Sequence, residues 1–86
     1  MNYDKMLEIF DKHEAIEIPQ KGKIDLAAFQ LLAEIFPKKS YVICHADIDQ
    51  IWFHGDYEKL TEKNILDLTK CGVFFDTNYN SLSMFV

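Results

Sequence analysis

The stretch from Tyr41 to Asp56, YVICHADIDQIWFHGD, constrains the fold more than any other part of the chain. Two apolar runs, Tyr41–Cys44 and Ile51–Phe53, flank the polar stop Asp47–Gln50, a pattern typical of a β-hairpin. A loop of two or four residues separates polar from apolar side chains better than a three-residue loop, so we expect that register. The expected cross-strand pairs are Ala46 with Ile51, Cys44 with Phe53 and Val42 with Gly55.

The two faces of this expected hairpin differ in chemistry. The face without polar side chains should point to the core, and it consists of Val42, Cys44, Ala46, Ile51 and Phe53. The other face consists of Tyr41, Ile43, His45, Asp47, Gln50, Trp52, His54 and Asp56. Such a mixture of rings, imidazoles and carboxylates is typical of a wet or partner-facing surface. We therefore expect a contiguous patch of Tyr41, Ile43, His45, Trp52 and His54, exposed unless Ala15–Ile18 or Tyr57–Leu60 folds over it.

Length and composition indicate one small acidic globular domain spanning residues 1–86. A hydrophobic fraction of 49% argues against a disordered chain, and the formal net charge of -5 argues against direct binding of nucleic acid. No apolar run approaches the roughly 18 residues that span a bilayer, and the N-terminus lacks the layout of a signal peptide. We expect a cytoplasmic protein. Its two cysteines are too few for a disulfide framework.

Helical spacing and capping residues predict helices from Asn2 to about His13, from Asp25 to Phe36 and from Thr61 to Cys71, with Gly72 as the last stop. The second helix is apolar on nearly every side, so we expect it between the first helix and the sheet. Two further strands, Val73–Asp76 and Ser81–Val86, should surround a turn. The predicted fold class is α+β, in the order α-α-β-β-α-β-β, with a four-stranded antiparallel sheet and helices mainly on one face.

An acidic stripe runs along the outer side of the first helix, where Asp4, Glu8 and Asp11 recur at helical spacing. Its plain interpretation is a solvated face. The alternative is a partial mimic of phosphates that engages a basic groove on another protein.

Two His-x-Asp units, His45-Ala46-Asp47 and His54-Gly55-Asp56, carry ligand types that suit zinc. Asp47 lies in the expected loop and Asp56 at the far strand end, too distant to share one coordination sphere, so we expect surface histidines and no metal. Cys44 and His45 are neighbours on a strand and point to opposite faces, which excludes a nucleophile beside its base. The chain has no arginine to clamp phosphates. We expect no catalytic residue and no cofactor.

The C-terminal stretch LTEKNILDLTKCGVFFDTNYNSLSMFV resembles the C-terminal halves of small uncharacterised proteins of phages and prophages. In those proteins a helix ends in a glycine-containing turn, followed by an aromatic strand, an acidic turn and a closing strand like Met84-Phe85-Val86. The resemblance covers about the last third of the chain and implies a fold more than a role. It brings no catalytic residue.

These features predict a non-enzymatic protein-binding module, a small phage or bacterial inhibitor of the anti-defence or immunity type that occludes a partner's surface. The expected contact residues are Tyr41, Ile43, His45, Trp52 and His54 of the hairpin, with Asp4, Glu8 and Asp11 assisting. The expected partner is another protein, such as a host defence or nucleic-acid-handling protein, and neither nucleic acid nor a membrane; a second copy of the chain is a further option. The alternative function is a metal-binding protein or metal-dependent hydrolase that uses His45 and His54.

Overall fold

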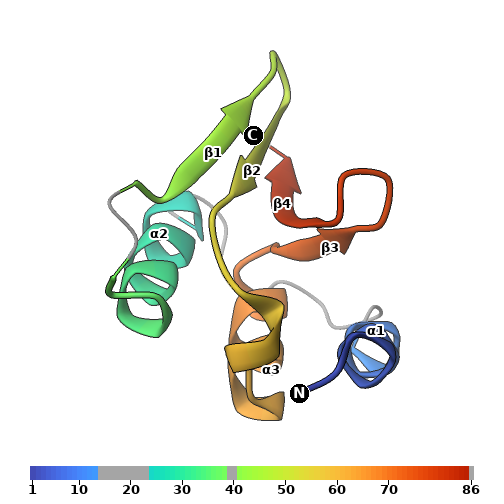
Figure 1. The fold of residues 1–86 in the computed structure, drawn as a ribbon. Coiled ribbons are helices and arrows are strands. Elements are labelled where there is room, and N and C mark those ends of the chain that lie inside the picture. The colour runs from blue at the N-terminus through green and yellow to red at the C-terminus, as the bar shows by residue number, and fades with distance from the viewer. Residues whose placement is uncertain (14–23, 39–40, 86) are drawn as a thin grey trace.

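The computed structural model describes residues 1–13, 24–38 and 41–85, shown in Figure 1. Its elements follow the predicted order and are α1 (Tyr3–Lys12), α2 (Ile24–Ile35), β1 (Ile43–Ala46), β2 (Gln50–Phe53), the short 3-10 helix η1 (Tyr57–Lys59), α3 (Glu62–Lys70), β3 (Phe74–Asp76) and β4 (Ser81–Phe85). The predicted connector Glu14–Lys23, which contains the candidate cover Ala15–Ile18, lies outside the described residues, as does Val86.

The four strands form one antiparallel sheet in the order β1-β2-β4-β3. This confirms the predicted α+β fold class. The last strand in sequence, β4, therefore lies in the interior of the sheet between β2 and β3. Its apolar side chains Leu82 and Met84 pair with Phe53 and Ile51 and are buried, as the alternation predicts.

Local capping signals set the helix ends. The Asn2 side chain accepts a hydrogen bond from the Lys5 backbone N–H at 2.8 Å, and Thr61 and Asn64 form a reciprocal capping box at the start of α3. Gly72, at φ 83°, ends α3, where the Val73 N–H donates to the Leu68 carbonyl at 3.0 Å. The second predicted cap, Asp25, is wrong, because α2 begins at Ile24 and Asp25 lies inside its first turn.

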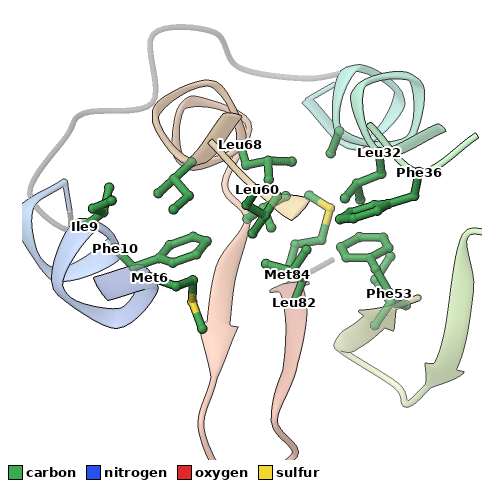
Figure 2. Close-up of a cluster of buried hydrophobic side chains, with 14 residues drawn as sticks. Met6, Ile9, Phe10, Leu32, Phe36, Phe53, Leu60, Leu68, Leu82 and Met84 are labelled. Atoms are coloured by element: carbon green, nitrogen blue, oxygen red, sulfur yellow. The ribbon is translucent and has the colours of Figure 1, made fainter. Parts of the chain in front are cut away.

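The helices of the described residues pack on one face of the sheet, and the core lies between them and β2 and β4. Figure 2 shows α3 between α1 and α2, with side chains of all three pointing toward Phe53, Leu82 and Met84. The expectation that α2 lies between α1 and the sheet is therefore wrong. Ala28 and Leu32 bury one side of α2, while Leu26 stays exposed. The helix between the other two is α3, and its Ile65 and Leu68 are fully buried.

The hairpin has the predicted register at its loop and a different one at its base. Ala46 pairs with Ile51 as expected, but an irregularity at Cys44 makes Ile43 the partner of Phe53. Of the five side chains predicted on the core face, Ile51 and Phe53 are buried and Val42 is half-buried, whereas Cys44 and Ala46 are exposed. The reason is the place of β1: it is an edge strand of a hairpin that extends beyond the helices in Figure 1.

Candidate functional site

The face of the sheet opposite the helices gathers aromatic and polar side chains. On β2, β3 and β4 these side chains alternate with the buried core residues, and His45 of β1 and Tyr79 of the β3–β4 turn join them. We call this surface the outer face; it consists of His45, Gln50, Trp52, Phe74, Asp76, Tyr79, Ser81, Ser83 and Phe85.

A hydrogen-bond network fixes the floor of the outer face. One oxygen of Asp76, Oδ2, accepts from Trp52 Nε1 at 3.0 Å and from Gln50 Nε2 at 3.2 Å. Gln50 Nε2 also donates to Ser83 Oγ at 2.8 Å, and Ser83 Oγ donates to the Ile51 carbonyl at 2.7 Å. Ser83 is fully buried. Because the buried polar groups of this network have partners, its side chains are held in one arrangement.

Trp52 belongs to this floor and is not a protruding anchor. Its side chain is only 4% exposed, so the expectation of an exposed tryptophan is wrong. The His45 ring lies with its centroid 5.1 Å from the Trp52 ring, and the Tyr79 ring lies at 4.9 Å. The cover comes from the β3–β4 turn and not from Tyr57, whose ring lies 6.2 Å from Phe75 on the core side.

A second aromatic pair completes the outer face. The rings of Phe74 and Phe85 stack at 5.2 Å with an angle of 28° between their planes. Ser83 pairs with Trp52 on one side and with Phe74 on the other, so a small hydroxyl separates the two aromatic groups. Tyr79 and Phe85 remain 64% exposed each and form the raised rim of the outer face. Neither residue was predicted from the sequence to belong to a contact surface. The available signal was Asp76, an acidic turn residue, and its carboxylate accepts from the Asn78 N–H at 2.9 Å, which orders this turn.

The other predicted patch residues lie elsewhere. Tyr41 and His54 line a small cavity of about 80 Å³ on the side of α2, together with Leu32, Ala33, Phe36, Pro37 and Val42. Ile43 pairs with Phe53 below the irregularity at Cys44. Of the five residues predicted to form one patch, ring contact joins His45 and Trp52. The irregularity breaks the strict alternation on which the prediction rested.

The acidic stripe of α1 is exposed but separate from the outer face. Met6, Ile9 and Phe10 attach α1 to the core on the helix side of the sheet, whereas Asp4, Glu8 and Asp11 face solvent. Glu8 lies 3.8 Å from the Lys5 ammonium group. The stripe and the outer face are thus two surfaces on opposite sides of the sheet, and the assisting role of the stripe in binding stays a prediction.

The two His-x-Asp units do not come together as a metal site in the described ranges. His45 packs on Trp52 while His54 lines the cavity near α2, and no group of three or more His, Cys, Asp or Glu side chains there is placed to hold a metal. Burial and the neighbouring Asp67 carboxylate raise the pKa of the Cys71 thiol, which disfavours the reactive thiolate. None of the helices described here is both long and apolar enough to cross a membrane.

Charge is distributed unevenly between the sheet and the helices. The strands and their two turns, residues 43–53 and 74–85, contain Asp47, Asp49 and Asp76 but neither lysine nor arginine. The lysines of the described residues lie on the helices and their connections; they are Lys5, Lys12, Lys38, Lys59, Lys63 and Lys70. The charged side chains of the sheet and its turns are therefore all carboxylates.

Comparison with known proteins finds no matching family model, no matching curated protein and no matching solved structure. The resemblance of the C-terminal third to phage and prophage proteins stays a prediction. The interpretation of the outer face depends on its own geometry and charge.

Proposed function

We propose that the protein is a non-enzymatic binding module that occludes a basic surface of another protein with the outer face of its sheet. The observation that carries this proposal is the combination of exposed rings with a sheet whose charged side chains are all carboxylates. Tyr79 and Phe85 project from a sheet that has three aspartates and no lysine or arginine, in residues 43–53 and 74–85. Aromatic side chains are common anchors of protein interfaces, and carboxylates select for cationic partners.

The floor beneath the rim favours binding by a rigid surface. Trp52 is held by Asp76 and covered by His45 and Tyr79, so these groups need little reordering when a partner arrives. A preorganised surface loses less conformational entropy on binding. The exposed ring of Tyr79 can also receive a lysine or arginine of the partner by a cation–π contact, in a region whose other charges are carboxylates.

The biological setting that fits best is inhibition in a phage or bacterial context. The net charge of -5 steers the protein toward basic surfaces. Proteins that handle nucleic acids carry such surfaces because they neutralise phosphates with lysine and arginine. A host defence protein of this kind is the partner we propose, and the resemblance of Leu60–Val86 to phage and prophage proteins supports the same setting.

The test is affinity purification from a bacterial lysate, followed by titration of the purified partner. Three forms of the protein are compared: the wild type, Tyr79→Ala and the matched control Tyr41→Ala. Both tyrosines are exposed and lose the same atoms, but Tyr41 lies on the α2 side of the hairpin. Loss of an aromatic anchor should weaken binding by about 10- to 100-fold in Tyr79→Ala, and the control should bind like the wild type.

The partner should also have a basic contact surface, and its affinity should fall as salt rises. Equal affinities for the wild type, Tyr79→Ala and Phe85→Ala would show that the outer face is not the contact surface. Circular dichroism spectra of each variant establish that the fold is intact. Both substitutions remove exposed rings, so we expect small effects on stability.

A further inference from the structure

We infer that the partner also donates an extended segment that pairs with the edge strand β1 and adds a fifth strand to the sheet. This inference depends on the proposed function, because it names how the protein partner is held beside the outer face. The observation that supports this inference is the exposure of the edge strand β1, because the other edge strand, β3, is half-buried.

The two edges of the sheet are unequal. The order β1-β2-β4-β3 leaves β1 and β3 as edge strands. At β3, α1 packs on the core side of the strand, where the Phe75 ring contacts Tyr3 at 5.7 Å and Phe10 at 6.4 Å, and all three residues of β3 are half-buried. At β1 all the residues from Ile43 to Ala46 are exposed, and within the described residues β1 pairs with β2 alone. An edge strand of this kind is a template for another strand.

The β1 edge lacks most of the devices that normally prevent pairing. Residues 41–49 contain no lysine and no proline. Instead they carry apolar side chains in solvent: Ile43 is 39% and Ile48 96% exposed. Two features do limit pairing: β1 is only four residues long, and the irregularity at Cys44 interrupts it at its base. The segment from His45 to Asp47 remains regular and open.

The backbone of Ala46 is placed to receive the added strand. The Asp47 N–H donates to the Gln50 carbonyl at 2.7 Å, and Asp47 therefore points its backbone groups toward β2. Backbone groups of successive residues in a strand point in opposite directions. The N–H and carbonyl of Ala46 consequently point away from β2, toward the open edge.

The side chains of this edge define the chemistry of the segment that fits. Ile43 is apolar, and Asp47 and Asp49 are exposed carboxylates beyond the strand end. A complementary segment has apolar residues beside Ile43 and lysine or arginine beside the two aspartates. A second copy of the chain would bring the same carboxylates and its own net charge of -5, which opposes self-pairing.

The experiment uses amide NMR spectra of the full chain and short synthetic peptides. The main peptide alternates valine and lysine; in the first control peptide glutamate replaces lysine, and in the second alternate backbone nitrogens are methylated and cannot donate. We expect the valine–lysine peptide to shift the amide of Ala46 and its neighbours, and both control peptides to bind at least about tenfold more weakly.

A protein variant tests the same contact from the other side. Ala46→Pro removes the outward N–H without removing a bond to β2, whereas Ala46→Ser keeps the donor. We expect Ala46→Pro to lose the peptide and Ala46→Ser to keep it. If Ala46→Pro fails to fold, the methylated peptide still decides, because it blocks pairing on an unchanged protein.

Three outcomes would overturn the inference. Amide shifts confined to Tyr79 and Phe85 would exclude strand pairing but leave the proposed function intact. The absence of any amide shift at millimolar peptide would also exclude strand pairing. A concentration-dependent dimer that Ala46→Pro abolishes would identify a second copy as the occupant. Failure of the proposed function itself has a different signature, namely a protein partner that binds Tyr79→Ala as tightly as the wild type.

Discussion

Replacing Asp76 with alanine should destabilise the protein through the single tryptophan. The carboxylate accepts from Trp52 Nε1 at 3.0 Å, and Trp52 is 4% exposed, so water cannot easily replace the lost acceptor. Gln50 keeps its bond to Ser83 at 2.8 Å. The Asn78 N–H is exposed and can donate to water instead. An orphaned buried donor costs about 1 to 3 kcal/mol, and with the lost charge-assisted bonds we expect about 2 to 3 kcal/mol less free energy of unfolding.

Urea denaturation measures this loss, and a double-mutant cycle assigns it to the indole. In a Trp52→Phe background there is no indole N–H to orphan, so Asp76→Ala should cost less there. The difference between the two costs should be about 1 to 2 kcal/mol. Far-ultraviolet circular dichroism follows unfolding in all four proteins of the cycle. Asp76→Asn serves as control because it retains an acceptor. The same cost for Asp76→Ala in both backgrounds would refute this account of the network.

Three further predictions concern the helices and their contacts. A Cβ atom on Gly55 would meet the buried Phe36 ring at 2.6 Å, so Gly55→Ala should lower the free energy of unfolding in urea by about 1 to 3 kcal/mol; an unchanged free energy would contradict this close packing. Thr61→Ala removes the cap of α3 and should cost about 1 kcal/mol in thermal unfolding, with Thr61→Ser recovering most of it. The Lys12 ammonium, through its hydrogen bond at 3.2 Å and its charge, lowers the pKa of the Glu62 carboxyl. Because the pKa of the Glu62 carboxyl is lower in the folded than in the unfolded protein, the contact stabilises the fold above the unfolded pKa, and this stabilisation is lost as pH falls through the folded pKa. Lys12→Ala should raise the pKa of the Glu62 carboxyl in an NMR titration, and an unchanged pKa would exclude the contact.

The sequence was most informative where the determining interactions are local. The caps at Asn2 and Thr61 and the stop at Gly72 depend on residues a few positions away, and these three predicted helix ends are confirmed. The alternation in β4 also predicted which side chains face the core, because that strand is covered by helices on one side. Local pattern and tertiary burial agree at these positions.

The sequence was less informative where distant segments decide burial. The Trp52 ring is covered by the Tyr79 ring, which is far away in sequence and reaches Trp52 because β4 pairs with β2. The sequence of the hairpin alone does not predict that β2 pairs with β4. At β1 the alternation failed because neither face of the strand is covered there, so burial does not enforce a strict register, and the chain accommodates an irregularity at Cys44. The uniformly apolar α2 gave no preferred side, and α3 took the central position.

The strand β2 links the stability of the fold to the geometry of its surface. Ile51 and Phe53 point into the core while Gln50 and Trp52 form the floor of the outer face, so a substitution in the floor also disturbs β2. A loss of binding in a Trp52 variant would therefore not distinguish a contact residue from a structural one. Tyr79 and Phe85 differ, because their rings project from the floor and remain exposed. Substitutions on this rim can change binding while the urea midpoint stays constant, and that separation is what identifies a contact surface.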